Sequence, residues 1–176
     1  QGMLLNHIFF RRNAGGGIDY IPPEEVDFSH DAEGRIVNGL HRTDGQPVEY
    51  GGVGKMGKSE RNGVDPQTLI DRFGADTARL YVMFAGSPED SAIWSDTGVE
   101  GGYRFLKRLW AYGQTHADAI REATDSPDTG KAAESVKAAR RELHLALKQA
   151  NFDYERIHYN TVVSAGMKML NALEAV

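Results

Sequence analysis

Residues 51–66 read GGVGKMGKSERNGVDP, and this stretch decides between two kinds of nucleotide-binding fold. Residues 52–59 satisfy the P-loop expression GxxxxGKS, in which backbone amides cradle phosphates. A P-loop requires a helix that begins at its Gly-Lys-Ser, because the N-terminus of that helix supplies the anion site. The Asn62-Gly63 pair and Pro66 would interrupt such a helix. A P-loop NTPase is therefore the least favoured alternative.

Two short helical segments are expected directly after this loop. Asp65 suits an N-cap, Pro66 suits the first helical position, and Gly74 is a typical C-terminal stop. A second apolar helix or run is expected over residues 78–84, ending at the Gly-Ser-Pro of residues 86–88.

From residue 97 the hydrophobic period changes to 3.6, which predicts helices to the end of the chain. Thr97 and Glu100 form a capping-box pattern at the start of a long helix that should run to about Ala123. Its expected core stripe, on which Trp110 falls as well, consists of Phe105, Leu106, Leu109, Tyr112 and Gly113.

Two more helices are expected after a linker at residues 126–130. One has a stripe of Val136, Leu143, Leu147 and Ala150, and the other begins near Asn160 with a stripe of Val163, Met167, Leu170 and Leu173. Three amphipathic helices with short connections imply an antiparallel bundle.

Residues 1–53 hold short apolar runs broken by turn residues, which predicts a small β-rich unit. Residues 31–34 and 43–46 are expected to form hairpin turns, because Asp and Gly tolerate the backbone that such turns require. The favoured interpretation is a solvated insertion without chemistry of its own.

The composition limits the classes of function. The chain of 176 residues suits one sizeable domain or two small ones, and its net charge of −5 argues against a strong non-specific nucleic-acid binder. Zero cysteines exclude disulfides and cysteine-based zinc sites, and the six histidines are widely spaced, so no protein-bound metal is expected. No apolar run approaches the roughly 20 residues that cross a bilayer, so a cytoplasmic protein without membrane contact is expected.

The residues Lys55-Met56-Gly57-Lys58-Ser59 resemble the KMSKS signature of class I aminoacyl-tRNA synthetases. The resemblance implies a mobile loop whose ammonium groups contact the triphosphate of ATP. As the amino-acid carboxylate attacks the α-phosphate, a positioned lysine stabilises the charge that builds on pyrophosphate. Lys58 is then expected to be the main stabilising residue and Lys55 its helper, while Met56, Gly57 and Ser59 shape the ATP-binding loop. Gly57 stands where the family usually has Ser, and a merely solvated basic loop is the alternative for five residues alone.

The longer context narrows the family. Residues 55–66 and 74–80 resemble the loop and following helix of the synthetases for leucine, isoleucine, valine and methionine. Residues 62–66 and 94–110 look most like bacterial leucyl-tRNA synthetases. Residues 159–163 are similar to the start of a helix in the anticodon-binding bundle of that family.

The resemblance implies an α+β fold in three parts. Residues 1–53 would hold the end of a catalytic strand and a β-rich leucine-specific insertion, residues 54–96 the KMSKS-type loop with short helices, and residues 97–176 part of an α-helical anticodon-binding domain. Because the chain starts at Gln1 and stops inside a helical pattern, an internal fragment of a larger enzyme is expected.

The implied parent enzyme is a leucine–tRNA ligase, which activates leucine with ATP and Mg²⁺ as co-substrates and transfers it to tRNA(Leu). None of the histidines forms the His-x-Gly-His turn of this family, and most of the leucine pocket and the editing domain are missing. The fragment alone is therefore expected to be inactive. The whole enzyme is expected to be a monomer. A stand-alone tRNA-binding module with an inactive loop is the alternative.

Two basic helix faces are candidates for tRNA contact, because residues three and four apart lie on one face of a helix. They consist of Arg104, Lys107 and Arg108 on the first long helix and of Lys137, Arg141 and Lys148 on the second. An ordinary solvated helix face is the alternative, and Glu134 and Glu142 dilute the second one.

Overall fold

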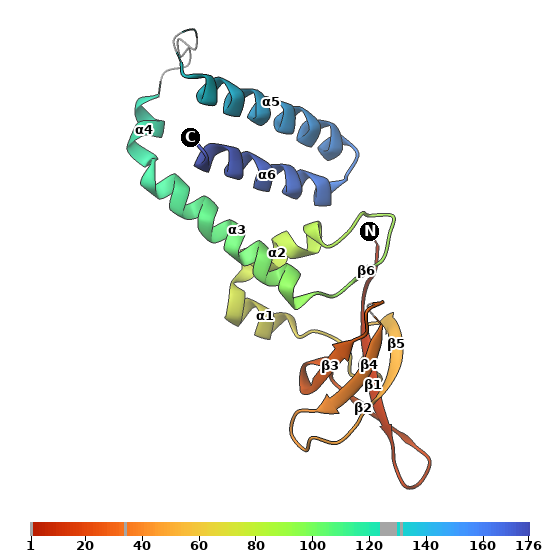
Figure 1. The fold of residues 1–176 in the computed structure, drawn as a ribbon. Coiled ribbons are helices and arrows are strands. Elements are labelled where there is room, and N and C mark those ends of the chain that lie inside the picture. Colours follow the sequence, from red (N-terminus) through yellow and green to blue (C-terminus); the bar gives the residue numbers. More distant parts are fainter. Residues whose placement is uncertain (1, 34, 124–129, 131) are drawn as a thin grey trace. The chain divides into compact units, whose positions relative to one another are not determined.

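The computed structural model describes residues 2–33, 35–123, 130 and 132–176 (Figure 1). The chain divides into two compact units. One extends up to Leu69 and includes Glu89–Trp94, and the other comprises Ile70–Pro88 and Ser95–Val176. The first unit holds the strands and the second holds the long helices, so the expected mixed content of strands and helices is confirmed.

The strand β1 (Leu4–Arg12) is the centre of the first unit. It pairs antiparallel with β2 (Ile18–Ile21) and with β5 (Glu49–Lys55), and its first residues pair parallel with β6 (Ala92–Ile93). These pairings place β5, and therefore the chain that leaves it at Lys55, beside the start of β1.

A second, two-stranded sheet consists of β3 (Val26–His30) and β4 (Ile36–His41), which follow the short 3-10 helix η1 (Pro23–Glu25). A small core joins the two sheets, because Phe9 of β1, Ile21 of β2 and Val26 of β3 are buried together. The expected β-rich unit is thus confirmed.

Both predicted turns are present, and each is closed by a backbone hydrogen bond. The first connects β3 to β4 and is closed by the amide of Asp31, which donates to the carbonyl of Arg35 at 2.9 Å; Gly34 lies outside the described residues. In the second, the amide of Gly45, at a φ of 66°, donates to the carbonyl of His41 at 2.8 Å.

The predicted boundaries of the first helix are confirmed. Helix α1 spans Pro66–Phe73, and the carboxylate of Asp65 accepts the amides of Gln67 and Thr68 at 3.3 and 3.0 Å. Gly74, at a φ of 83°, ends the helix, and α2 (Ala75–Phe84) follows at once.

The start of α3 (Asp96–Thr115) corrects the predicted capping box. The N-cap is Ser95, whose extended backbone directs its hydroxyl to the amide of Gly98 at 3.1 Å. Thr97 lies inside the helix and its hydroxyl contacts that of Ser95 instead. The helix also stops before Ala123: His116 leaves helical geometry at a ψ of 13°, and the separate helix α4 covers Ala117–Glu122.

Trp110 was expected in the core, but 71% of its surface is exposed. Along α3, Val99 and Gly102 are buried, whereas residues 107–111 are exposed. The apolar spacing therefore continues past the part of α3 that other helices of this unit cover.

The last two helices, α5 (Glu134–Glu155) and α6 (Tyr159–Glu174), form an antiparallel pair, as Figure 1 shows. Leu170 and Ala150 are buried, which agrees with the predicted stripes, but Val136 and Leu147 are 43% and 45% exposed. Helix α6 also packs against α2 and α3. The predicted linker lies outside the described residues apart from Gly130. No helix in the described ranges is both long and apolar enough to span a membrane.

Candidate nucleotide loop and basic helix faces

The lysine-rich loop begins where β5 ends. Lys55 is the last residue of that strand, and Lys58 lies in a turn at residues 58–61. Both lysine side chains are exposed, and none of the ion pairs found among the described residues involves either of them. The nearest carboxylate in sequence, Glu60, accepts a hydrogen bond from the hydroxyl of Ser59 at 2.8 Å. The loop therefore presents two ammonium groups to solvent.

This geometry excludes the P-loop alternative. The strand before the loop, β5, runs antiparallel to its neighbour β1, and the residues at Lys58 and Ser59 form a turn rather than the first turn of a helix. The next helix, α1, begins only at Pro66. No helix N-terminus therefore lies at the position where a P-loop binds phosphate.

The sequence marks Asn62 as a helix breaker and as part of the leucyl-type stretch at residues 62–66, but it does not show that the Asn62 side chain bonds to the loop. Its side chain has 0% exposure, and its Oδ1 accepts the amide of Gly57 at 2.8 Å. Its Nδ2 donates to the carbonyls of Lys55 at 3.3 Å and Asn6 at 3.4 Å. The loop is thus closed across its base by one amide side chain. The local signal in the sequence is an Asn before a Gly, and that pattern is typical of any turn.

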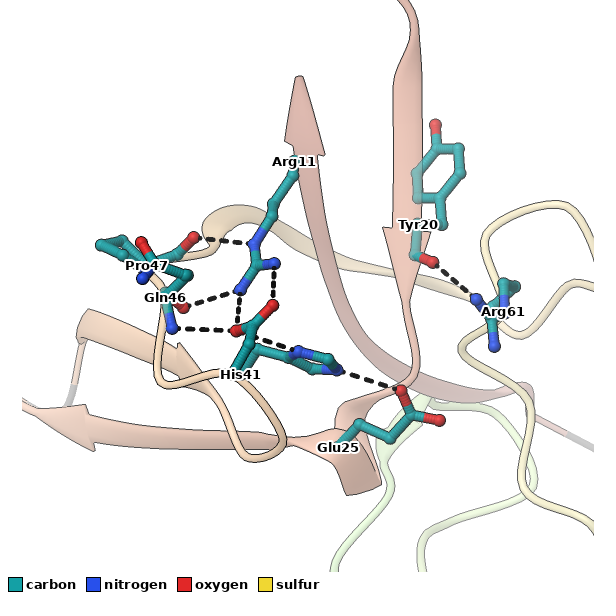
Figure 2. Close-up of polar contacts among 8 residues, drawn as sticks. Arg11, Tyr20, Glu25, His41, Gln46, Pro47 and Arg61 are labelled. Carbon is teal, nitrogen blue, oxygen red and sulfur yellow. Dashed lines mark hydrogen bonds and ion pairs between the residues drawn. The ribbon is translucent and has the colours of Figure 1, made fainter. Parts of the chain in front are cut away.

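Arg61 adds a second anchor to the loop. It has a φ of 51°, a left-handed conformation that non-glycine residues rarely adopt. Its guanidinium donates to the carbonyl of Tyr20 at 3.2 Å (Figure 2). The turn at residues 58–61 is therefore held by β2 on one side and by Asn62 on the other.

Gly57, at the position where the family usually has Ser, lies close to Glu60. A Cβ built on Gly57 would lie 2.4 Å from Oε2 of Glu60, the end of a flexible side chain. A serine would fit here only after Glu60 moved away.

Figure 2 shows a separate polar cluster in the same unit, centred on Arg11. Arg11 binds both carboxylate oxygens of Asp44 and donates to the carbonyls of Gln46 and Pro47 at 2.8 and 3.0 Å. His41 lies between Asp44 and Glu25, at 3.2 and 3.3 Å from their carboxylates. These bonds tie the turn at residues 43–46 to β1, which is a structural role.

The six basic residues of the predicted tRNA faces fall into two groups. Arg108 is bound by Glu174 and by Asn171 of α6, the latter at 2.8 Å, and Lys137 pairs with Glu134 at 2.9 Å. The ammonium of Lys107 lies 5.3 Å from the centre of the Tyr103 ring. The remaining three, Arg104, Arg141 and Lys148, are exposed and take part in none of the ion pairs of the described residues.

An open apolar groove of about 660 Å³ lies beside the first of these faces. Its walls come from the end of α1, the start of α2 and from α3, and they include Phe73, Leu106, Leu109 and Trp110. The exposed Trp110 lines this groove. Among the described residues, no cluster of three or more His, Cys, Asp or Glu side chains could hold a metal ion.

Comparison with known proteins identifies the family. The leucine–tRNA ligase of Bordetella petrii is 57% identical over 175 residues, which is 99% of this chain and 20% of that protein. The corresponding proteins of Variovorax paradoxus and Ralstonia nicotianae are 57% and 55% identical over 174 residues. The chain belongs to the leucine–tRNA ligase family. It spans about one fifth of the length of these curated relatives.

A solved leucine–tRNA ligase has the same fold over part of its length. The agnB2 LeuRS of Agrobacterium radiobacter K84, crystallised as a ternary complex with tRNA and LeuAMS, is 28% identical with a TM-score of 0.59. The match covers 69% of this chain and 16% of that protein. No protein-family model matches the chain.

Proposed function

We propose that this chain supplies two working parts of a leucine–tRNA ligase. One is the lysine loop at residues 55–59, which acts on ATP during leucine activation. The other is part of the helical domain that binds tRNA(Leu). The observation that carries the proposal is the pair of exposed lysines, Lys55 and Lys58, on a loop whose backbone is fastened at its base by Asn62.

The loop residues have distinct roles in the proposed reaction. The leucine carboxylate attacks the α-phosphate of ATP, a new P–O bond forms, and the bond to pyrophosphate breaks. Negative charge then grows on the departing pyrophosphate, where Lys58 stabilises the transition state more than it stabilises bound ATP. Lys55 assists from the end of β5. Mg²⁺ accompanies ATP as a co-substrate, and Met56, Gly57 and Ser59 shape the loop around the phosphates.

The helical part is proposed to contact the tRNA backbone. Arg104, Arg141 and Lys148 are exposed and unpaired within the described chain, so their charges are available for phosphates. Arg108 and Lys137 are already paired with carboxylates, and Lys107 contacts a ring. We therefore rank the first three above the other three candidates, with residues 97–176 as part of the anticodon-binding domain.

The remaining parts of the proposal concern the whole enzyme. Residues 1–53 would hold the end of a catalytic strand and the β-rich leucine-specific insertion, and residues 54–96 would hold the KMSKS-type loop and the helices that connect it to the helical domain. The enzyme would act in the cytoplasm as a monomer, with ATP, leucine and tRNA(Leu) as its substrates. The leucine–tRNA ligase names of relatives that match 99% of the chain support leucine activation and tRNA charging as the activity of the whole enzyme.

A segment exchange tests the proposal. The matched stretch of the Bordetella petrii ligase is replaced by this chain, and leucine-dependent ATP–pyrophosphate exchange and tRNA(Leu) charging are measured. Exchange and charging within about tenfold of the unaltered ligase are expected, a loss of about 1.4 kcal/mol or less of transition-state stabilisation. A chimaera that folds and binds tRNA but activates no leucine would instead support the tRNA-binding module with an inactive loop.

A further inference from the structure

Asn62 connects three separate pieces of backbone in the first unit. Its Oδ1 accepts from Gly57 inside the lysine loop, and its Nδ2 donates to Lys55 at the end of β5 and to Asn6 in β1. In turn, the side-chain Nδ2 of Asn6 donates to the backbone carbonyl of Asn62 at 3.0 Å. The two asparagines thus bind one another reciprocally.

Because both asparagines are buried, their hydrogen bonds favour one arrangement of the side chains. Asn62 is 0% exposed and Asn6 is 4% exposed, so water cannot replace a lost partner easily. An unsatisfied buried amide costs more free energy than an exposed one, which favours the single arrangement in which all these bonds are made. The Oδ1 of Asn6 is occupied as well, because it accepts the amide of His7 at 2.8 Å.

The bonded groups lie inside the stretch that carries the two lysines. The Lys55 carbonyl belongs to the first lysine, and the Gly57 amide immediately precedes the second, Lys58. Neither lysine side chain takes part in the network, so both ammonium groups stay exposed. The network therefore sets the path of the backbone without using the charges themselves.

We propose that Asn62 is a positioning residue for leucine activation: with Asn6, it fixes the loop so that Lys58 meets the departing pyrophosphate. This inference rests on the proposed function of the loop. Because Asn62 is fully buried and its side chain bonds to backbone groups, it acts on the reaction through Lys58. Loss of its bonds lets the loop drift by a distance comparable with a bond length, which is enough to slow a step that depends on placement.

The test uses the segment-exchange ligase with Asn62→Ala. The kcat of leucine-dependent ATP–pyrophosphate exchange is expected to fall roughly 10- to 100-fold, because the lysine is misplaced in the transition state. The KM for leucine and the affinity for a non-hydrolysable leucyl-adenylate analogue should stay unchanged, since the analogue carries no pyrophosphate. Equal losses in exchange and in analogue binding would mean that Asn62 only maintains the fold, which would overturn the proposal.

A double-mutant cycle separates this inference from the proposed function. If Asn62 acts through Lys58, Asn62→Ala should change kcat less than about twofold when Lys58→Ala is already present, because interacting positions are not additive. Full additivity would overturn the inference. If Lys58→Ala itself has no effect, the proposed function of the loop fails. If it lowers kcat while Asn62→Ala does not, only the inference fails.

Two further variants guard against a simple folding defect. Asn6→Ala removes the partner of Asn62 while leaving the three bonds of the Asn62 side chain in place, and a smaller fall in kcat is expected; an unchanged kcat would exclude the role assigned to Asn6. Asn13→Ala is a control for the loss of a turn-bracing asparagine elsewhere in the first unit, because the exposed Asn13 side chain accepts the backbone amides of Gly15 and Gly17. That turn lies between β1 and β2, so exchange should not change. An equal fall in kcat for Asn13→Ala and Asn62→Ala would overturn a specific effect on the loop.

Discussion

The guanidinium of Arg11 binds both carboxylate oxygens of Asp44, at 2.7 and 2.8 Å. This bond joins β1 to the turn at residues 43–46, more than thirty residues later in the chain. The hydrogen bonds from Arg11 hold the pKa of Asp44 well below its ordinary value of 3.8, and the amide of Gln46 contributes as well. The first unit is thus closed by a charged contact at its surface.

This pKa shift predicts a pH dependence of stability. Because the folded pKa of Asp44 is depressed, its contribution is complete above the unfolded value of 3.8 and is lost as pH falls through the folded value. Asp44→Asn should lower the urea midpoint of the first unit at about pH 7, and the gap from the wild type should narrow towards about pH 3. Native amide signals of residues 41–46 in two-dimensional NMR report the midpoint. A gap that is the same at both pH values would contradict the assignment.

The N-cap of α3 gives a prediction that distinguishes Ser95 from Thr97. Ser95→Ala removes the acceptor for the amide of Gly98 and should destabilise the start of α3 by about 1 kcal/mol. Thr97→Ala removes only a hydroxyl contact with Ser95 and should cost clearly less. Hydrogen exchange of the amides in residues 97–100, measured by mass spectrometry, gives both values. A larger effect of Thr97→Ala would restore the capping box that the sequence pattern suggested.

The basic faces are expected to differ in their response to salt. In the segment-exchange ligase, Arg104→Ala should weaken tRNA(Leu) binding and lower the slope of log K against log salt by about 1, the value for one lost phosphate contact. Arg108→Ala should instead loosen α6, because it removes the bonds to Glu174 and Asn171, and it should leave the slope nearly unchanged. Fluorescence anisotropy with labelled tRNA measures both. A normal slope for Arg104→Ala would remove this residue from the interface.

The chain by itself should neither bind Mg²⁺-ATP tightly nor charge tRNA. Calorimetric titration of the folded 176-residue chain is expected to detect no binding in the micromolar range, that is, about −8 kcal/mol. Leucine-dependent charging should be absent as well. Micromolar binding would mean that the loop is a self-sufficient phosphate site, and charging by the chain alone would contradict the fragment interpretation. Circular dichroism confirms folding before the titration.

Local signals in the sequence predicted the elements around the loop well. Asp65 before Pro66, with Gly74 eight residues later, specifies a short helix through its own caps, and the structure has that helix at those residues. The turns at residues 31–34 and 43–46 were equally local. Such features depend on neighbouring residues in the sequence, so they can be predicted without knowledge of the fold.

Features that depend on residues far apart in the sequence could not be predicted from the sequence. The cap of α3 falls on Ser95 because the backbone there is extended, which no spacing rule gives. Trp110 continues an apolar stripe, yet the stripe does not say where the covering helices end. The partner of Asn62 is Asn6, separated by 56 residues, so its burial could only be found in the structure.

The central claim is that Lys58 stabilises the departing pyrophosphate, and Lys58→Ala in the segment-exchange ligase tests it most directly. The kcat of leucine-dependent ATP–pyrophosphate exchange should fall by about 100-fold or more, the usual effect of removing one group that stabilises transition-state charge. Lys55→Ala should cause a smaller fall, and the exposed Lys168 of α6, changed to Ala, should cause none. An exchange rate within about twofold of the unaltered chimaera after Lys58→Ala, a change of less than about 0.5 kcal/mol, would contradict the account.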